Sequence, residues 1–169
     1  MRELLVKKNT DIVKNAFKEI DYYTIILLTG LFVVIGGISQ AGVIDVIGNA
    51  IGSMSGGSPF LAYTIIVWMS VILSAFIDNI PYTATMLSIV PVIAAGVGCD
   101  PKLLYYGLLC GATLGGNLTP IGASANITAI GILRKEGHEV KSTTFMKYGV
   151  PFTLSAVITG YILLWLIWG

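Results

Sequence analysis

Long apolar stretches with few charged positions dominate the chain. Residues 22–41 and 148–168 each contain about 20 nearly uncharged residues, the length of helix that crosses a hydrocarbon core about 30 Å thick. Both stretches predict membrane-spanning helices. Two polar interruptions divide the apolar sequence between them: residues 77–83 (Ile-Asp-Asn-Ile-Pro-Tyr-Thr) and residues 114–126 (Leu-Gly-Gly-Asn-Leu-Thr-Pro-Ile-Gly-Ala-Ser-Ala-Asn). At bilayer depth, non-helical backbone survives only where it is buried in protein or lines a cavity, so both interruptions indicate a binding site.

Almost all charged residues lie in two patches, residues 1–21 and residues 134–147; between them are only Asp45, Asp78, Asp100 and Lys102. Lys and Arg favour the cytoplasmic side, which predicts a cytoplasmic amphipathic arm at 1–21 and a cytoplasmic loop at 134–147. If residues 58–98 crossed the membrane once, Arg134 would emerge on the wrong side. Two short spans or a re-entrant hairpin over residues 60–97 restore the parity. The hairpin is favoured, because each leg beside the first interruption has about 15 residues, which is short for a full span.

The remaining segments complete an all-α membrane protein with about three full spans and one re-entrant hairpin. Residues 43–51 predict a short interfacial helix that leads into a Gly- and Ser-rich connector. Residues 102–133 predict a span broken in its middle, and residues 148–168 form the last span. Only 11% of the residues are charged, compared with about 25% in soluble domains. The protein is therefore expected in the inner or plasma membrane, with its N-terminus in the cytoplasm and lipid around it.

The first interruption places a carboxylate, Asp78, within an apolar stretch. Ionisable residues inside a membrane are costly and usually functional, although a carboxylate at the interface or one kept protonated by burial is the alternative. Asn79 adds an amide and Thr83 a hydroxyl, while Pro81 is expected to break the helix. Together they predict a pocket of hard oxygen ligands at a helix N-terminus.

The second interruption combines polar side chains with residues that disturb a helix. The candidate ligands are Asn117, Thr119, Ser124 and Asn126, and the expected hinge positions are Gly115, Gly116, Pro120 and Gly122. The glycines permit unusual backbone angles and close approach, and Pro120 suits the start of a second half-helix. Na⁺ is a candidate ligand through the amides of Asn79, Asn117 and Asn126, and half-helix N-termini attract anions. The alternative is a helix-packing seam, since Gly111 and Gly115 have a small-xxx-small spacing.

Other chemistries find little support in the sequence. There is no phosphate-binding loop, zinc motif or nucleophile triad, and Cys99 and Cys110 lie far from His138. An intramembrane aspartyl protease would need a second carboxylate near Asp78, and none lies at membrane depth. We therefore expect no enzyme, no cofactor beyond coupling to Na⁺ or H⁺, no metal centre and no nucleic-acid partner.

The two interruptions also carry a family resemblance. Residues 78–83 (Asp-Asn-Ile-Pro-Tyr-Thr), followed by residues 115–126, resemble the ion-transporter superfamily. The most similar branch holds arsenite permeases, citrate-transporter-like permeases, Na⁺/H⁺ antiporters and the pink-eyed-dilution melanosomal protein. Residues 21–24 and 30–37 also resemble the helix that opens the C-terminal repeat of that family.

The resemblance implies one half of an inverted-repeat, elevator-type transporter, because only the second of two repeats is recognisable. It implies a secondary, ion-coupled permease for arsenite, another anion or carboxylate, or Na⁺/H⁺. Its partner would be an N-terminal half-transporter or a second copy, with a small ion as substrate. No Arg or Lys lies at membrane depth to compensate a di- or tricarboxylate, which leaves the substrate class open. The alternative is a non-transporting membrane subunit or inactive fragment that packs against a partner.

Overall fold

The computed structural model describes residues 22–169, and that part of the chain is helical without any strand. The chain divides into two compact units, residues 1–34 and residues 35–169. Helix α3 (Tyr22–Gln40) begins in the first unit, and the arm predicted at residues 1–21 lies outside the described residues. The all-α prediction is confirmed.

The second unit contains the C-terminal end of α3 and six further helices. They are α4 (Val43–Met54), α5 (Pro59–Ser74), α6 (Asn79–Val97), α7 (Pro101–Gly115), α8 (Ser124–Lys135) and α9 (Ser142–Trp168). Among the described helices, α6 and α9 are long and apolar enough to cross a membrane. The C-terminal part of α3 and α4 meet at a bend of 70° and count as a third span if the pair is taken together. Gly42, at the bend, has a φ of 73°, a left-handed conformation that favours glycine.

Three of these helices begin with an ordinary capping signal. Ser58, Asp78 and Asp100 each occupy the N-cap position and accept a hydrogen bond from a backbone N–H two or three residues later. Proline follows the cap at Pro59 and Pro101, where its missing N–H costs nothing. The polar residues that interrupt the apolar pattern thus fix where α5, α6 and α7 start.

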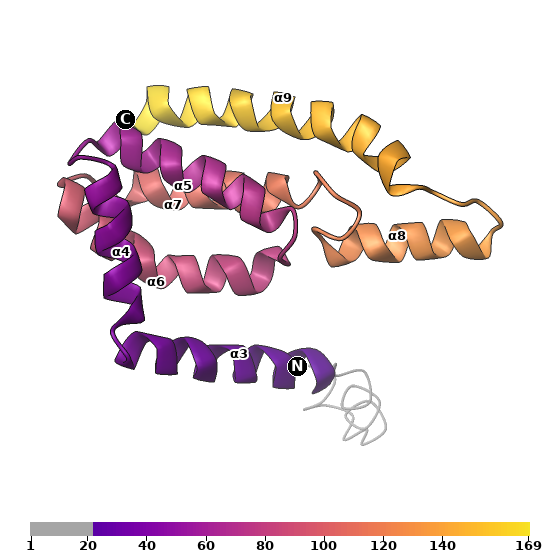
Figure 1. Cartoon of the computed structure of the whole chain (residues 1–169), viewed down its shortest axis with the longest axis horizontal. Coiled ribbons are helices and arrows are strands. Elements are labelled where there is room, and N and C mark those ends of the chain that lie inside the picture. The colour runs from indigo at the N-terminus through magenta and orange to yellow at the C-terminus, as the bar shows by residue number, and fades with distance from the viewer. Residues whose placement is uncertain (1–21) are drawn as a thin grey trace, which may run out of the picture. The chain divides into compact units, whose positions relative to one another are not determined.

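Helices α5 and α6 form a helical hairpin, and α7 runs beside α5 while α9 runs along α7 (Figure 1). Helix α4 packs mainly on α6. The buried core lies where α5, α6 and α7 meet and includes Ile66, Val67, Ile89, Leu104 and Leu108. This packing holds the turn of the hairpin next to the end of α7.

Three glycines of α7 allow its backbone to touch α5. A Cβ on Gly107 would lie 2.7 Å from a ring carbon of Tyr63, and one on Gly115 would lie 2.5 Å from the carbonyl oxygen of Val71. Gly111 is in similar contact with the backbone of Val67. The small-residue seam suggested by the sequence is therefore present, and it leads directly into the break that follows Gly115.

Several predicted boundaries differ from the structure. Helix α9 begins at Ser142, so the polar residues 142–147 are helical rather than part of the predicted loop 134–147. They form exposed turns of a helix, which the apolar pattern alone did not reveal. Helix α8 extends to Lys135 at the other end of that loop, and α4 continues to Met54, beyond the predicted 43–51.

The predicted roles of two prolines were wrong. The second half-helix starts at Ser124, and Pro120 instead lies in a turn closed by a hydrogen bond from Gly122 N–H to the Thr119 carbonyl. Proline favours the second position of such a turn. Pro81 lies in the first turn of α6, where no N–H is needed, so it does not break the helix.

Candidate functional site

The turn of the α5–α6 hairpin and the break between α7 and α8 are joined by hydrogen bonds. The hydroxyl of Thr119, in the break, donates to the carbonyl oxygen of Ala75, which follows α5. One residue before Ala75, the hydroxyl of Ser74 donates to the carbonyl oxygen of Ala112 at 2.5 Å. Thr119 and Ser74 are both buried. The second interruption is thus bonded to the backbone just before the first, although Thr119 and Ala75 are 44 residues apart in sequence.

Gly122 lies at the point of closest contact. A Cβ at this position would lie 2.6 Å from the carbonyl oxygen of Gly116 and 2.9 Å from those of Ser74 and Ala75. Only a residue without a side chain fits among these backbone oxygens. Gly115, Gly116 and Gly122 do not have left-handed φ angles, so the expected unusual backbone angles are absent and close approach is their role.

Asn126 closes the break from the side of α8. Its amide nitrogen donates to the carbonyl oxygens of Gly116, at 2.9 Å, and Thr119, at 3.1 Å. These bonds satisfy two carbonyls that leave the helical pattern where α7 ends. The carbonyl oxygen of the Asn126 side chain accepts no hydrogen bond from the described residues and remains available as a ligand.

Asp78 and its neighbours lie at the start of α6. The Asp78 carboxylate accepts a hydrogen bond from the backbone N–H of Ile80 at 3.2 Å and is half-buried. Asn79 and Thr83 are half-buried in the first turns of the same helix. Within the described residues, no hydrogen bond joins these three side chains to the broken helix. The structure therefore brings Thr119 and Gly122 to the hairpin turn, where Asp78 follows Ala75 by three residues, and Asn126 bonds to the break itself.

Ser124 and Asn117 have different surroundings. Ser124 is the exposed first residue of α8, and its carbonyl accepts a hydrogen bond from the hydroxyl of Thr128 at 2.9 Å. Asn117 lines an open groove of about 570 Å³ against α9. The three amides proposed for Na⁺, those of Asn79, Asn117 and Asn126, thus have separate neighbours.

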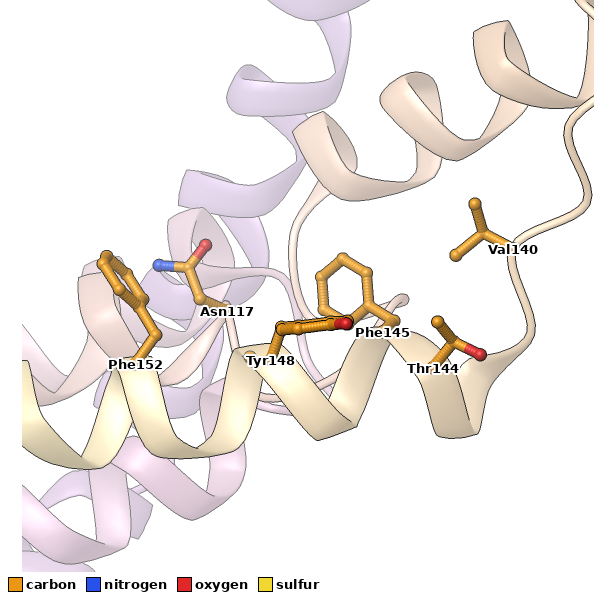
Figure 2. A pocket seen from close by; sticks show the side chains of 7 residues that line it. Asn117, Val140, Thr144, Phe145, Tyr148 and Phe152 are labelled. Atoms are coloured by element: carbon orange, nitrogen blue, oxygen red, sulfur yellow. The ribbon is translucent and has the colours of Figure 1, made fainter.

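The groove beside Asn117 is a feature that sequence reasoning missed. Its other lining residues come from the start of α9 and the preceding loop: Val140, Thr144, Phe145, Tyr148, Gly149 and Phe152. Figure 2 shows the aromatic side chains of Phe145, Tyr148 and Phe152 on the same side of α9 as Asn117. Their spacing of three and four residues was the available signal, because such positions share a helix face.

A carboxylate- or thiolate-based metal centre is not part of the described structure. No group of three His, Cys, Asp or Glu side chains lies close enough there to hold a metal ion. Oxygen ligands at the junction are instead backbone carbonyls and side-chain amides or hydroxyls, which suit a hard monovalent cation. The uncapped N-terminus of α8, where Ala123 provides no side-chain acceptor, offers free N–H groups to an anion.

Replacing Thr119 with valine tests the bond between the two interruptions. We expect the free energy of unfolding to fall by about 1–3 kcal/mol, because the buried Ala75 carbonyl loses its hydroxyl donor while the side-chain volume is kept. Thermal unfolding of the detergent-solubilised protein measures the effect. Thr128→Val is the matched control, since the Thr128 hydroxyl is exposed and bonds within its own helix. Equal losses in the two variants would contradict a specific role for the Thr119 bond.

Comparison with known proteins shows which family the chain resembles. A family model described as citrate transporter (CitMHS) matches residues 4–111. An uncharacterized transporter of Mycobacterium tuberculosis is 33% identical over 149 residues, which are 87% of this chain and 35% of the relative. An uncharacterized transporter of Synechocystis is 27% identical over 96% of this chain and 40% of the relative. The P protein of Sus scrofa is 31% identical over 83% of this chain and 18% of the relative. The chain thus spans about a third of the length of the mycobacterial relative, and no solved structure matches it.

Proposed function

Because the chain belongs to the citrate transporter family of the ion-transporter superfamily, we propose that it is the C-terminal half of a secondary active transporter. The substrate and its coupling ion would bind where the hairpin turn meets the broken helix. The observation that carries this proposal is the bonded junction itself, in which Thr119 and Gly122 of the break contact the backbone after α5. Irregular backbone from two elements at one place is typical of midplane sites in secondary transporters.

The junction offers complementary groups for a cation and an anion. Carbonyl oxygens of Ser74, Ala75 and Gly116 converge on Gly122, and the free oxygen of Asn126 lies on the same break. These are ligands for Na⁺, and Asp78 supplies a carboxylate for Na⁺ or a proton. The N-terminus of α8 supplies N–H groups for the anionic part of a substrate without any Arg or Lys.

We assign the substrate class as a small carboxylate, in line with the description of the family, with arsenite and Na⁺/H⁺ exchange as the competing assignments. A carboxylate can be held by helix N-termini and neutralised in part by a bound Na⁺, so the absence of basic residues at this depth does not oppose it. Arsenite would need only the neutral amides and hydroxyls.

The position of α8 supports a hairpin that ends inside the membrane. Helix α8 continues for 12 residues past the junction, about 18 Å along its axis, before the chain reaches its basic end at Arg134 and Lys135. The hairpin turn contacts Gly122, two residues before α8 begins. If the hairpin turn lay at the same membrane face as Arg134, there would be no room for the length of α8 between the turn and that face.

Reconstitution tests the proposed activity. This chain and the proposed N-terminal part, taken from a longer relative, would be co-expressed, purified and placed in proteoliposomes with an inward Na⁺ or H⁺ gradient. Uptake of radiolabelled citrate, with arsenite and ²²Na⁺ as parallel substrates, is expected only when both parts are present. A complex that forms but moves none of these substrates under either gradient would instead support a non-transporting subunit.

The proposed orientation predicts how Cys99 reacts. Cys99 lies between α6 and α7, on the side opposite the basic loop, and should be labelled from outside intact cells by a membrane-impermeant maleimide. Burial and the neighbouring Asp100 carboxylate raise the pKa of the Cys99 thiol, so labelling is slow at pH 7 and rises roughly tenfold per pH unit up to that pKa. Cys99→Ser, which retains the half-buried Cys110 of α7, is the control. Labelling of Cys99 only after the cells are permeabilised would reverse the assigned orientation.

A further inference from the structure

The groove beside Asn117 continues the exposed apolar face of α9. Tyr148 and Phe152, at its rim, are 68% and 64% exposed, and Ile158, Ile162 and Leu166 extend the exposed apolar surface along the helix. In a membrane protein such a surface faces acyl chains. The groove therefore opens toward lipid and not only toward the interior of the protein.

Polar groups along the groove and its rim lack side-chain hydrogen-bond partners within the described residues. The Asn117 amide, the Thr144 hydroxyl and the Tyr148 hydroxyl take part in none of the side-chain hydrogen bonds there, whereas Phe145 and Phe152 provide apolar walls (Figure 2). An apolar cavity with a few unpaired polar groups is typical of a ligand site. A ligand that matches it has a long apolar part and several hydrogen-bonding groups at one end.

The charge around the groove favours an anionic ligand. Residues 134–147 contain four Lys or Arg and two Glu, and Lys141 lies directly before α9, next to Val140 and Thr144 of the groove. No side chain caps the start of α9, which leaves the N–H groups of Ser142 and Thr143 unpaired. Basic residues at a membrane face attract anionic headgroups.

We propose that this groove binds an anionic phospholipid. The acyl chain lies against Phe145 and Phe152, the ester region meets Asn117 and Tyr148, and the phosphate lies near Lys141 and the start of α9. A helix from the rest of the transporter is the competing occupant, but an apolar helix would gain no stabilisation from the basic residues at the rim. Because Asn117 belongs to the break, the lipid composition of the membrane would affect the structure of the junction through the bound lipid.

Native mass spectrometry of the purified chain, and of its complex with the N-terminal part, tests this proposal. With phosphatidylglycerol and phosphatidylcholine added in equal amounts, we expect phosphatidylglycerol to be retained in at least about fivefold excess. The double variant Tyr148→Ala/Phe152→Ala should lose most of the bound lipid, and Lys141→Gln should reduce the preference for phosphatidylglycerol toward one. Lys102→Gln and Ile162→Ala, which lie away from the groove, should retain lipid as the unmodified protein does.

Circular dichroism checks that each variant remains helical. Tyr148→Phe, which keeps the ring, is the milder variant to use if another variant fails to fold, and it should retain acyl-chain binding. Equal retention of the two lipids would overturn the proposal. So would unchanged retention in the double variant, or lipid bound by the chain alone and excluded from the complex, since the last result would assign the groove to the protein partner.

Discussion

Replacing Gly122 with alanine is expected to reduce transport by the complete protein at least about tenfold and to lower its free energy of unfolding by about 1–3 kcal/mol. The added methyl group would lie 2.6 Å from the Gly116 carbonyl oxygen and 2.9 Å from those of Ser74 and Ala75. All three neighbours are backbone atoms and cannot turn away as side chains do. The hairpin turn must therefore separate from the break, which moves the proposed cation ligands apart.

Gly131→Ala is the matched control for this experiment. Gly131 lies in α8, and a Cβ there would have no neighbour within 4 Å. Alanine favours a helix over glycine by about 1 kcal/mol, so this variant should transport normally and be at least as stable. Flux in proteoliposomes and thermal unfolding measure both properties. Normal flux in Gly122→Ala would show that transport does not depend on the close contact.

Asp78→Asn is expected to abolish ion-coupled flux while leaving the fold intact. Asp78 caps α6 by accepting a hydrogen bond from Ile80, and asparagine caps helices about as well as aspartate. The substitution therefore removes the charge and keeps the cap. If the carboxylate binds Na⁺ or a proton, flux driven by either gradient should fall more than about tenfold with an unchanged unfolding temperature.

Asp100→Asn provides a closely matched comparison. Asp100 caps α7 in the same way, by accepting a hydrogen bond from the backbone N–H of Lys102 at 2.9 Å, but it is exposed and far along the chain from the junction. Asp78→Ala, which loses both charge and cap, should reduce stability by about 1 kcal/mol as well as flux. Undiminished sodium- or proton-dependent flux in Asp78→Asn would falsify the assignment of Asp78 to the ion site.

The sequence predicted the helices and the two interruptions because these depend on local chemistry. Apolar length marks the spans, and Asp78 and Pro120 mark places where a helix begins or cannot continue. The meeting of Thr119 with Ala75 was expected only in outline, since the partner of a hydroxyl is decided by packing between distant segments. The aromatic groove was missed for the same reason, because its walls come from two distant segments, the break between α7 and α8 and the start of α9 with the loop before it.

The errors at helix ends have a common physical origin. Pro120 and Ser124 are both suitable helix starts, and the hydrogen bond between Gly122 and Thr119 decides in favour of a turn. Likewise, residues 142–147 carry too few apolar side chains to indicate a span, yet they extend α9 because nothing in them opposes helix formation. In both segments, the local sequence preferences for helix and for turn or loop are nearly equal.

Because of the glycine seam between them, α5 and α7 are expected to move together as one rigid unit. At Gly111 and Gly115 the two backbones touch directly, and no side-chain rotamers lie between them there to absorb a displacement, so a shift of the hairpin turn is expected to move α7 with it. Helix α7 has 15 residues and is about 22 Å long, and its N-terminus lies two residues after Cys99. A fluorescent label on Cys99 would therefore report, from the opposite end of α7, the movement of the buried junction between Thr119 and Ala75.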